Sequence, residues 1–122
     1  MKKTVTLVAA LFSFAAVFAD TETVNGVTYT YSISDGEATI EARDEWGNFW
    51  SAIPSSTSGE LVVPSTLGGC PVTTIGEGTF YDCSSLASVT IPNSVTSIGA
   101  CAFFGCSGMS FAFYRHFSFF AD

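Results

Sequence analysis

Two stretches of the chain align at a constant offset of 23 residues: Ile75-Gly76-Glu77-Gly78-Thr79-Phe80-Tyr81-Asp82-Cys83-Ser84-Ser85-Leu86 and Ile98-Gly99-Ala100-Cys101-Ala102-Phe103-Phe104-Gly105-Cys106-Ser107-Gly108-Met109. Ile, Gly, Phe, Cys and Ser recur at the same places, and Leu86 becomes Met109. A period of roughly 20–50 residues is typical of a solenoid, in which each unit buries its apolar face against its neighbour. The repeat therefore indicates a surface for binding.

Each 23-residue unit reads as two short strands and one helical turn. Residues 88–91 alternate as a strand, Pro92 opens a turn, and residues 95–98 form a second strand that Gly99 ends. Residues 101–106 then predict about one helical turn, with Phe103 and Cys106 spaced to share its inner face. The expected fold is α+β and mostly β, a short solenoid with these core positions: Ile75, Phe80, Cys83, Leu86, Val89, Ile91, Val95, Ile98, Phe103 and Cys106.

Residues 20–59 precede the repeats and predict a β-rich cap followed by an aromatic and serine-rich loop. Residues 21–42 read as a β-meander with turns at Asn25-Gly26 and at Asp35-Gly36. A solenoid needs such a cap because an uncapped coil leaves bare core and unpaired strand edges. A strand that ends at Pro64 matches the one that ends at Pro92, so the repeats are expected over residues 60–109.

The last segment, residues 110–122, departs from the repeat and is crowded with aromatic residues. It is too short and too interrupted by Arg115-His116 to span a membrane. The sequence leaves two interpretations open. One is a hydrophobic closing strand, and the other is a degenerate tail left by truncation or a frame shift in a longer array.

The first 19 residues predict a signal peptide. Lys2 and Lys3 begin it, an apolar run follows, and Val17-Phe18-Ala19 offers the small residues that a signal peptidase reads. The alternative is a membrane anchor that is retained. The apolar run counts against it, because it is shorter than the about 20 residues that a membrane span needs. The expected product is exported, which means secreted, at the cell surface or periplasmic, with no transmembrane span in the mature chain.

Removal of residues 1–19 leaves two arginines against 11 acids, a formal charge of −9. Such a surface repels nucleic acid and anionic lipid, so nucleic-acid binding is excluded as a function class. The four cysteines, Cys70, Cys83, Cys101 and Cys106, could form disulfides in an exported protein. Since Cys83 and Cys106 hold the same place in successive units, a ladder of buried thiols is favoured over a bond between them.

The residue pattern from Leu86 through Val89-Thr90-Ile91-Pro92, Ser94 to Gly99, Ala102-Phe103 and Cys106-Ser107 closely resembles the BspA-like leucine-rich repeat. The preceding unit fits the same pattern, with Thr79 in place of the usual Ala. The resemblance covers about residues 60–109. It implies a secreted or surface-exposed protein, of a mostly bacterial family, that adheres to or binds other proteins and has no shared catalytic motif.

No residue constellation predicts catalysis, a cofactor or a metal site. Asp44 and Glu45 could suggest a glycosidase pair with Glu41 or Glu60, but nothing defines the pocket that such chemistry requires. His116 lies in the aberrant tail, there is no nucleophile elbow, and no Cys pair has zinc-ligand spacing. The sequence therefore predicts a protein that is not an enzyme.

Trp46, Phe49 and Trp50 are the best candidates for ligand contact. Aromatic faces bind sugar rings or anchor protein interfaces, although the same residues could merely cover the open end of the first coil. Three functions follow as hypotheses. The leading one is an exported, non-catalytic adhesion or protein-interaction module whose partner is an extracellular protein or glycan. The others are a carbohydrate-binding module that uses this trio, and a truncated remnant without independent function.

Overall fold

The computed structural model describes residues 19–109 and 113–114, and in that part of the chain all regular structure is β. It begins with an antiparallel meander of β1 (Asp20–Val24), β2 (Val27–Ser34) and β3 (Glu37–Ile40). Both residues of each connecting turn, Asn25-Gly26 and Asp35-Gly36, have positive φ, as two-residue hairpin turns require. The meander predicted for the cap is thus present.

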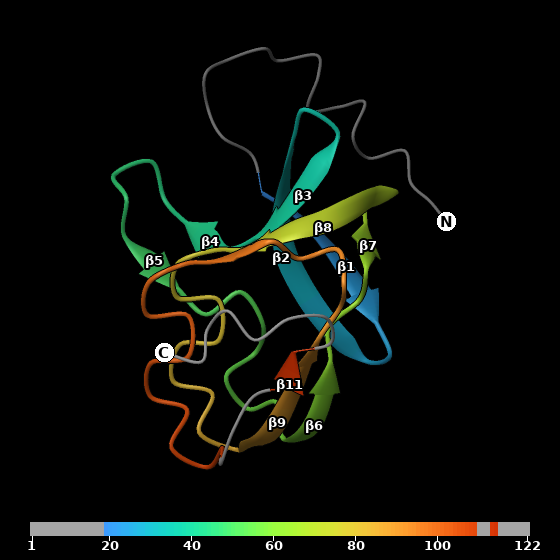
Figure 1. Cartoon of the computed structure of the whole chain (residues 1–122). Helices are drawn as coiled ribbons and strands as arrows, with labels where there is room; N and C mark the ends of the chain where they lie inside the picture. The colour runs from blue at the N-terminus through green and yellow to red at the C-terminus, as the bar shows by residue number, and fades with distance from the viewer. Residues whose placement is uncertain (1–18, 110–112, 115–122) are drawn as a thin grey trace.

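Two parallel ladders follow the meander and form the sides of the solenoid (Figure 1). One joins β3, β8 (Cys70–Ile75) and β10 (Ser97–Ile98), and the other joins β6 (Gly59–Val62), β9 (Leu86–Ile91) and β11 (Phe113–Tyr114). Thr74 pairs with Ser97 and Thr90 pairs with Phe113, both at the 23-residue offset of the repeat. One repeat unit is therefore one coil of the stack.

Most of the first coil of the stack comes from sequence that precedes the expected repeats, which begin at residue 60. β3 pairs in parallel with β8, with a register shift after Ala38, and β6 pairs in parallel with β9. Residues 37–62 thereby supply one strand to each ladder. Between these strands lie β4 (Ala42–Arg43) and β5 (Phe49–Trp50), which form a short antiparallel hairpin. β7 (Thr66–Leu67) pairs back on β8 through Gly68 and Gly69. The cap is thus continuous with the solenoid.

The helical turn predicted over residues 101–106 is wrong: this segment is a run of hydrogen-bonded turns. Cys101 has φ 58° and Gly105 has φ 83°, values that a right-handed helix does not contain. The carbonyl oxygens of Ala100, Ala102 and Phe104 also accept hydrogen bonds from Gly78, Phe80 and Asp82 of the preceding coil, at 3.2, 2.8 and 2.7 Å. These carbonyls therefore bond to the neighbouring coil instead of stabilising a helix.

The predicted signal peptide lies almost wholly outside the described residues, as does most of the predicted tail. Of the tail, residues 113–114 form β11, whose parallel pairing with β9 keeps the repeat register. The backbone thus continues the stack at a point where the sequence had lost the pattern. The described residues contain no helix long and apolar enough to cross a membrane.

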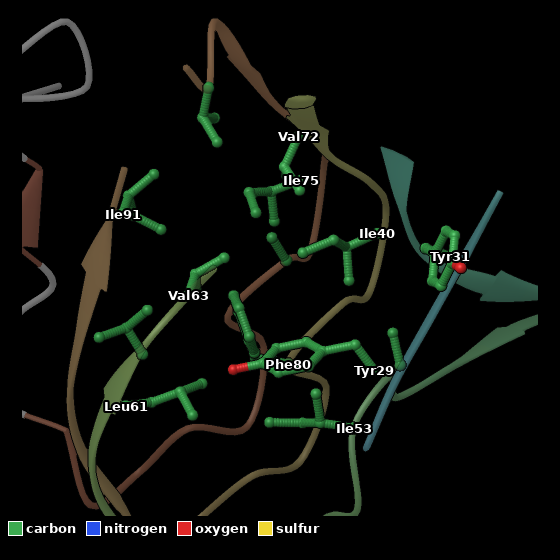
Figure 2. Packing of buried hydrophobic residues seen from close by; sticks show 14 of the residues in the cluster. Tyr29, Tyr31, Ile40, Ile53, Leu61, Val63, Val72, Ile75, Phe80 and Ile91 are labelled. Atoms are coloured by element: carbon green, nitrogen blue, oxygen red, sulfur yellow. The ribbon is translucent and has the colours of Figure 1, made fainter. Parts of the chain in front are cut away.

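The hydrophobic core lies between the two ladders (Figure 2). Leu61, Val63 and Ile91 face Ile40 and Ile75 across it, and the Phe80 ring lies near its centre. Phe80 has no exposed surface, and its ring stacks on that of Phe103 in the next coil at 5.2 Å between centroids. Burial of aromatic and branched side chains at about 25 cal/mol per Å² is the main stabilising term for such a stack.

Candidate functional site

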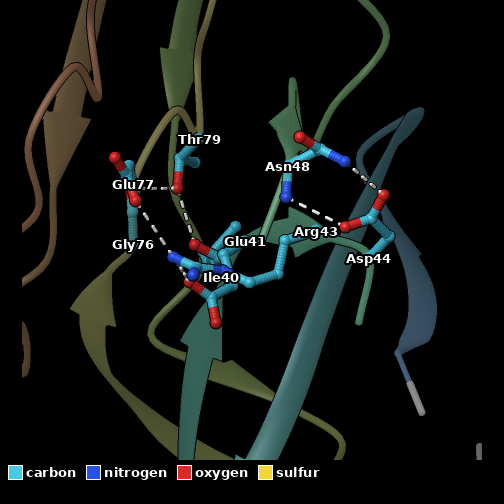
Figure 3. A network of polar contacts seen from close by, with 8 residues as sticks. All are labelled: Ile40, Glu41, Arg43, Asp44, Asn48, Gly76, Glu77 and Thr79. Carbon is cyan, nitrogen blue, oxygen red and sulfur yellow. Dashed lines mark hydrogen bonds and ion pairs between the residues drawn. The ribbon is translucent and has the colours of Figure 1, made fainter. Parts of the chain in front are cut away.

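The β4–β5 hairpin holds two of the predicted contact residues at the surface, and Asp44 fixes its turn (Figure 3). The Asp44 carboxylate accepts hydrogen bonds from the backbone N–H groups of Trp46 and Asn48, both at 2.9 Å, and from the Asn48 side-chain amide at 2.8 Å. The bond from the Asn48 side chain is the main cause that lowers the Asp44 pKa from its ordinary value. The charged carboxylate thus organises the turn that carries Trp46.

The three predicted contact residues differ in exposure. Trp46 is 77% exposed at the turn and Trp50 is 50% exposed on β5. Phe49 is half-buried because its ring packs over Gly78, whose position leaves no space for a Cβ beneath that ring. The hairpin therefore uses Phe49 to join the first coil to the second, while the two tryptophans face solvent.

An aromatic ladder runs along the side of the stack that holds the turns of residues 76–85 and 99–108, which we call the turn side. It consists of Phe49, Tyr81 and Phe104. The Phe49 ring meets the Tyr81 ring edge-on, at 5.7 Å between centroids and 81° between planes. The Tyr81 ring stacks on the Phe104 ring at 5.4 Å and 15°. Phe104 at the end of the ladder is 58% exposed. The stack thus offers an aromatic face to which each of three successive coils contributes one ring.

Sequence reasoning missed Tyr81 and Phe104, although the signal was available. They occupy the same place in successive repeats, one position after the predicted core pair Phe80 and Phe103. Residues so placed stack one coil apart in a solenoid. A pair of aromatic residues at an outward repeat position therefore predicts a ladder. The contact with Phe49 could not be predicted in this way because Phe49 precedes the repeats.

The predicted core positions lie as follows. Ile75, Phe80, Cys83, Leu86, Val89, Ile91 and Val95 are buried, whereas Ile98, Phe103 and Cys106 are half-buried in the last coil described. All four cysteines are free thiols. Burial raises the pKa of Cys83 and of Cys106, so both thiols stay protonated at neutral pH. The Cys106 thiol donates to the Phe80 carbonyl oxygen at 3.0 Å, and the Cys83 sulfur lies 3.4 Å from the Ser51 hydroxyl.

Charge on the described surface is almost entirely negative. Residues 19–109 contain ten acidic side chains and one basic side chain, Arg43. The Arg43 guanidinium lies 3.4 Å from a carboxylate oxygen of Glu41 and 3.2 Å from one of Glu77 (Figure 3). These are exposed pairs, which contribute at most about 1 kcal/mol each. Arg43 is thus already flanked by acids and leaves the surrounding surface negative.

Two other features of the described residues bear on possible sites. An open hollow of about 560 Å³ lies on the β6–β9 side, lined mainly by apolar atoms of residues 62–65, Thr90 and residues 92–94. It holds no charged side chain, so it offers no group for acid–base chemistry. Among residues 19–109 and 113–114, no three Cys, His, Asp or Glu side chains gather as a metal-binding group.

The comparisons with solved structures agree with this architecture. A leucine-rich repeat protein of T. pallidum is 26% identical, with a TM-score of 0.56 over 70% of this chain. A leucine-rich cell surface protein of Faecalibacterium prausnitzii is 27% identical, with a TM-score of 0.56 over 80% of this chain. A leucine-rich repeat protein of Bacteroides capillosus is 32% identical, with a TM-score of 0.53 over 77% of this chain.

The chain spans 36%, 24% and 64% of the lengths of these three proteins. No curated protein matches it. The family model described as a BspA type leucine-rich repeat region matches residues 63–120, and so continues past Met109, where the sequence resemblance was expected to end. The match, the 23-residue coil and the three structural neighbours agree that the repeat region of this chain is similar to the BspA-type leucine-rich repeat.

Proposed function

We propose that this chain is an exported, non-catalytic protein-interaction module that adheres through its turn side. The observation that carries the proposal is the aromatic ladder, which ends in the exposed ring of Phe104. Large aromatic side chains left at a surface are typical anchors of protein interfaces. Repeat proteins of this kind use such extended surfaces for binding, and one structural neighbour is described as a cell surface protein.

Export is part of the proposal and rests on the predicted signal peptide in residues 1–19. Expression in a bacterial host with its own secretion system tests this part. Mass spectrometry of the exported product should give an N-terminus at Asp20. An intact N-terminus, or retention of the product in the cytoplasm, would refute export without bearing on the binding surface.

Binding to a panel of purified extracellular matrix and bacterial surface proteins tests the module itself, measured by surface plasmon resonance. Phe104→Ala should weaken binding to any partner by about tenfold, because interface aromatics contribute on the order of 1–2 kcal/mol or more. Val62→Ala is the matched control, since Val62 is 64% exposed but lies on β6, away from the ladder. Equal binding by both variants would place the interface elsewhere.

Carbohydrate binding is the second candidate function, and the exposure of Trp46 and Trp50 favours it. Exposed indole faces stack on sugar rings in the way that they anchor other ligands. A glycan array should then show binding that is lost in Trp46→Ala and Trp50→Ala. The third hypothesis, a remnant without function, is weakened because the family match runs to residue 120 and β11 keeps the repeat register.

A further inference from the structure

An acidic side chain, that of Asp82, lies near the exposed end of the aromatic ladder. Tyr81 lies in a turn that begins near Glu77 and is followed directly by Asp82. The Asp82 side chain lies against Gly105, so it borders the residue that follows Phe104. Within the described residues, the Asp82 carboxylate has neither an ion-pair nor a hydrogen-bond partner. A carboxylate with no partner among the described residues therefore lies against the residue that follows the exposed Phe104 ring.

Both features attract cations. The face of an aromatic ring carries negative electrostatic potential, and a lysine or arginine held over it is stabilised by about 0.5–1 kcal/mol at an exposed site. A neighbouring carboxylate adds a charge-assisted hydrogen bond to the same group. The described surface contributes no competing cation there, because its one basic residue, Arg43, already lies between Glu41 and Glu77.

We propose that the Tyr81–Phe104 end of the ladder, with Asp82, binds arginine or lysine side chains of a basic segment in an extracellular protein. The inference rests on the proposed function and specifies the chemistry of its partner. Charge complementarity supports this choice, since residues 19–109 carry ten acids against one arginine. An acidic partner would be repelled by Asp82, and an uncharged donor would bond to it more weakly than a cation does.

The probe is a fluorescein-labelled peptide of alternating arginine and serine, with a control peptide in which citrulline replaces arginine. Fluorescence anisotropy with the purified protein should show binding of the arginine peptide only. Phe104→Leu, which keeps apolar area but removes the ring face, should weaken binding by about fivefold. Affinity should also fall as sodium chloride rises from 0.1 M to 1 M, since the Debye length shrinks from about 10 Å to about 3 Å.

Asp82→Asn and Asp35→Asn form a matched pair of variants. Both aspartates are exposed and have positive φ, 58° and 53°, a conformation that asparagine tolerates, and both changes remove one negative charge. Asp35 lies in the β2–β3 turn and touches no ring of the ladder. Asp82→Asn should weaken peptide binding severalfold more than Asp35→Asn does. Circular dichroism of each variant checks that the fold is intact.

Three outcomes would overturn the inference. Absence of arginine-peptide binding at low salt is one. Equal losses in Asp82→Asn and Asp35→Asn would show attraction to overall charge without a site. If glycans bind in a way that depends on Phe104 and the arginine peptide does not bind, the ladder is a sugar-binding surface. The proposed function has a separate readout, because a protein partner that loses affinity with Phe104→Ala would still establish the interface after any failure of the arginine peptide.

Discussion

The hydroxyl group of buried Thr79 donates a hydrogen bond to the carbonyl oxygen of Ile40 at 2.6 Å, and so links the first repeat to the last strand of the cap meander. It also lies 2.8 Å from the Gly76 carbonyl oxygen. The next repeat has Ala102 at this place, and there the Gly99 N–H alone bonds to the Ile75 carbonyl oxygen, at 2.7 Å. The threonine that departs from the repeat pattern thus serves the junction with the cap.

Thr79→Val should lower the free energy of unfolding by about 1–2 kcal/mol, because it removes a buried hydrogen bond at nearly constant volume. Urea denaturation followed by circular dichroism measures the change. Thr96→Val is the control, since the exposed Thr96 hydroxyl makes a longer bond of 3.3 Å to Thr73. If both variants lose the same stability, the Thr79 bond has no special role at the junction.

The repeat made much of the fold predictable. A 23-residue offset specifies which strand lies beside which, and the pairs Thr74–Ser97 and Thr90–Phe113 follow from it. The match of the strands that end at Pro64 and Pro92 likewise agrees with the pairing of β6 and β9. The pairing of β3 with β8 could not be predicted, because β3 joins its ladder through backbone hydrogen bonds that need no repeated side chain. The turns of residues 101–106 were predicted as a helical turn for a different reason. Residues three apart face the same way in a helical turn and also in successive tight turns.

The candidate site was only partly predictable. Trp46 and Trp50, which were selected from sequence as contact residues, are exposed, whereas Phe49 faces Tyr81 through a contact that spans 32 residues. Long-range contacts of this kind depend on how the hairpin packs, which local pattern does not encode. Tyr81 and Phe104 were readable as one repeat position, and a search for outward aromatic pairs would have found them.

Cys101→Gly should stabilise the protein. Cys101 has φ 58°, and the equivalent residue of the preceding repeat, Gly78, has φ 69°. A non-glycine residue in this conformation is strained by about 1–2 kcal/mol, while glycine costs about 0.5–1 kcal/mol in chain entropy. The free energy of unfolding should therefore rise by about 0.5–1 kcal/mol. Thermal unfolding of Cys101→Gly beside Cys101→Ser, which keeps the strain, measures it.

Gly105→Ala tests the opposite direction at the other positive-φ position of the same coil. Gly105 has φ 83°, and an added Cβ would collide with the Asp82 side chain and approach its backbone. We expect a loss of more than about 1 kcal/mol in the free energy of unfolding. Gly26→Ala provides the control, because Gly26 has the same φ of 83° but nothing within 4 Å of the added atom. Equal losses would mean that the contact with Asp82 contributes nothing.

Alkaline pH should destabilise the fold through Tyr29. Burial raises the pKa of Tyr29 to about 12 from its ordinary value of 10. Because the folded-state pKa is the higher one, the stabilisation is complete below pH 10 and is lost as the pH rises toward 12. A shift of two pKa units corresponds to about 2–3 kcal/mol. In Tyr29→Phe, the free energy of unfolding should depend less on pH across this range than it does in the wild type. If the free energy of unfolding of Tyr29→Phe falls with pH as steeply as that of the wild type, the loss of stability is due to other groups. Tyr31 is one such group, since its pKa is raised mainly by burial.

Acid should release the β4–β5 hairpin before the core unfolds. Hydrogen bonds, chiefly from the Asn48 side chain, lower the Asp44 pKa from its ordinary value of 3.8, so folding favours the charged carboxylate. The stabilisation is therefore present above pH 3.8 and is lost as the pH falls through the lower folded-state pKa. Tryptophan fluorescence reports the hairpin, since both tryptophans lie in it, and far-UV circular dichroism reports the stack. Asp44→Ala should shift the fluorescence at neutral pH and remove its acid transition, whereas Glu45→Gln, one residue away, should leave both unchanged. A fluorescence change that coincides with global unfolding in the wild type would contradict separate release of the hairpin.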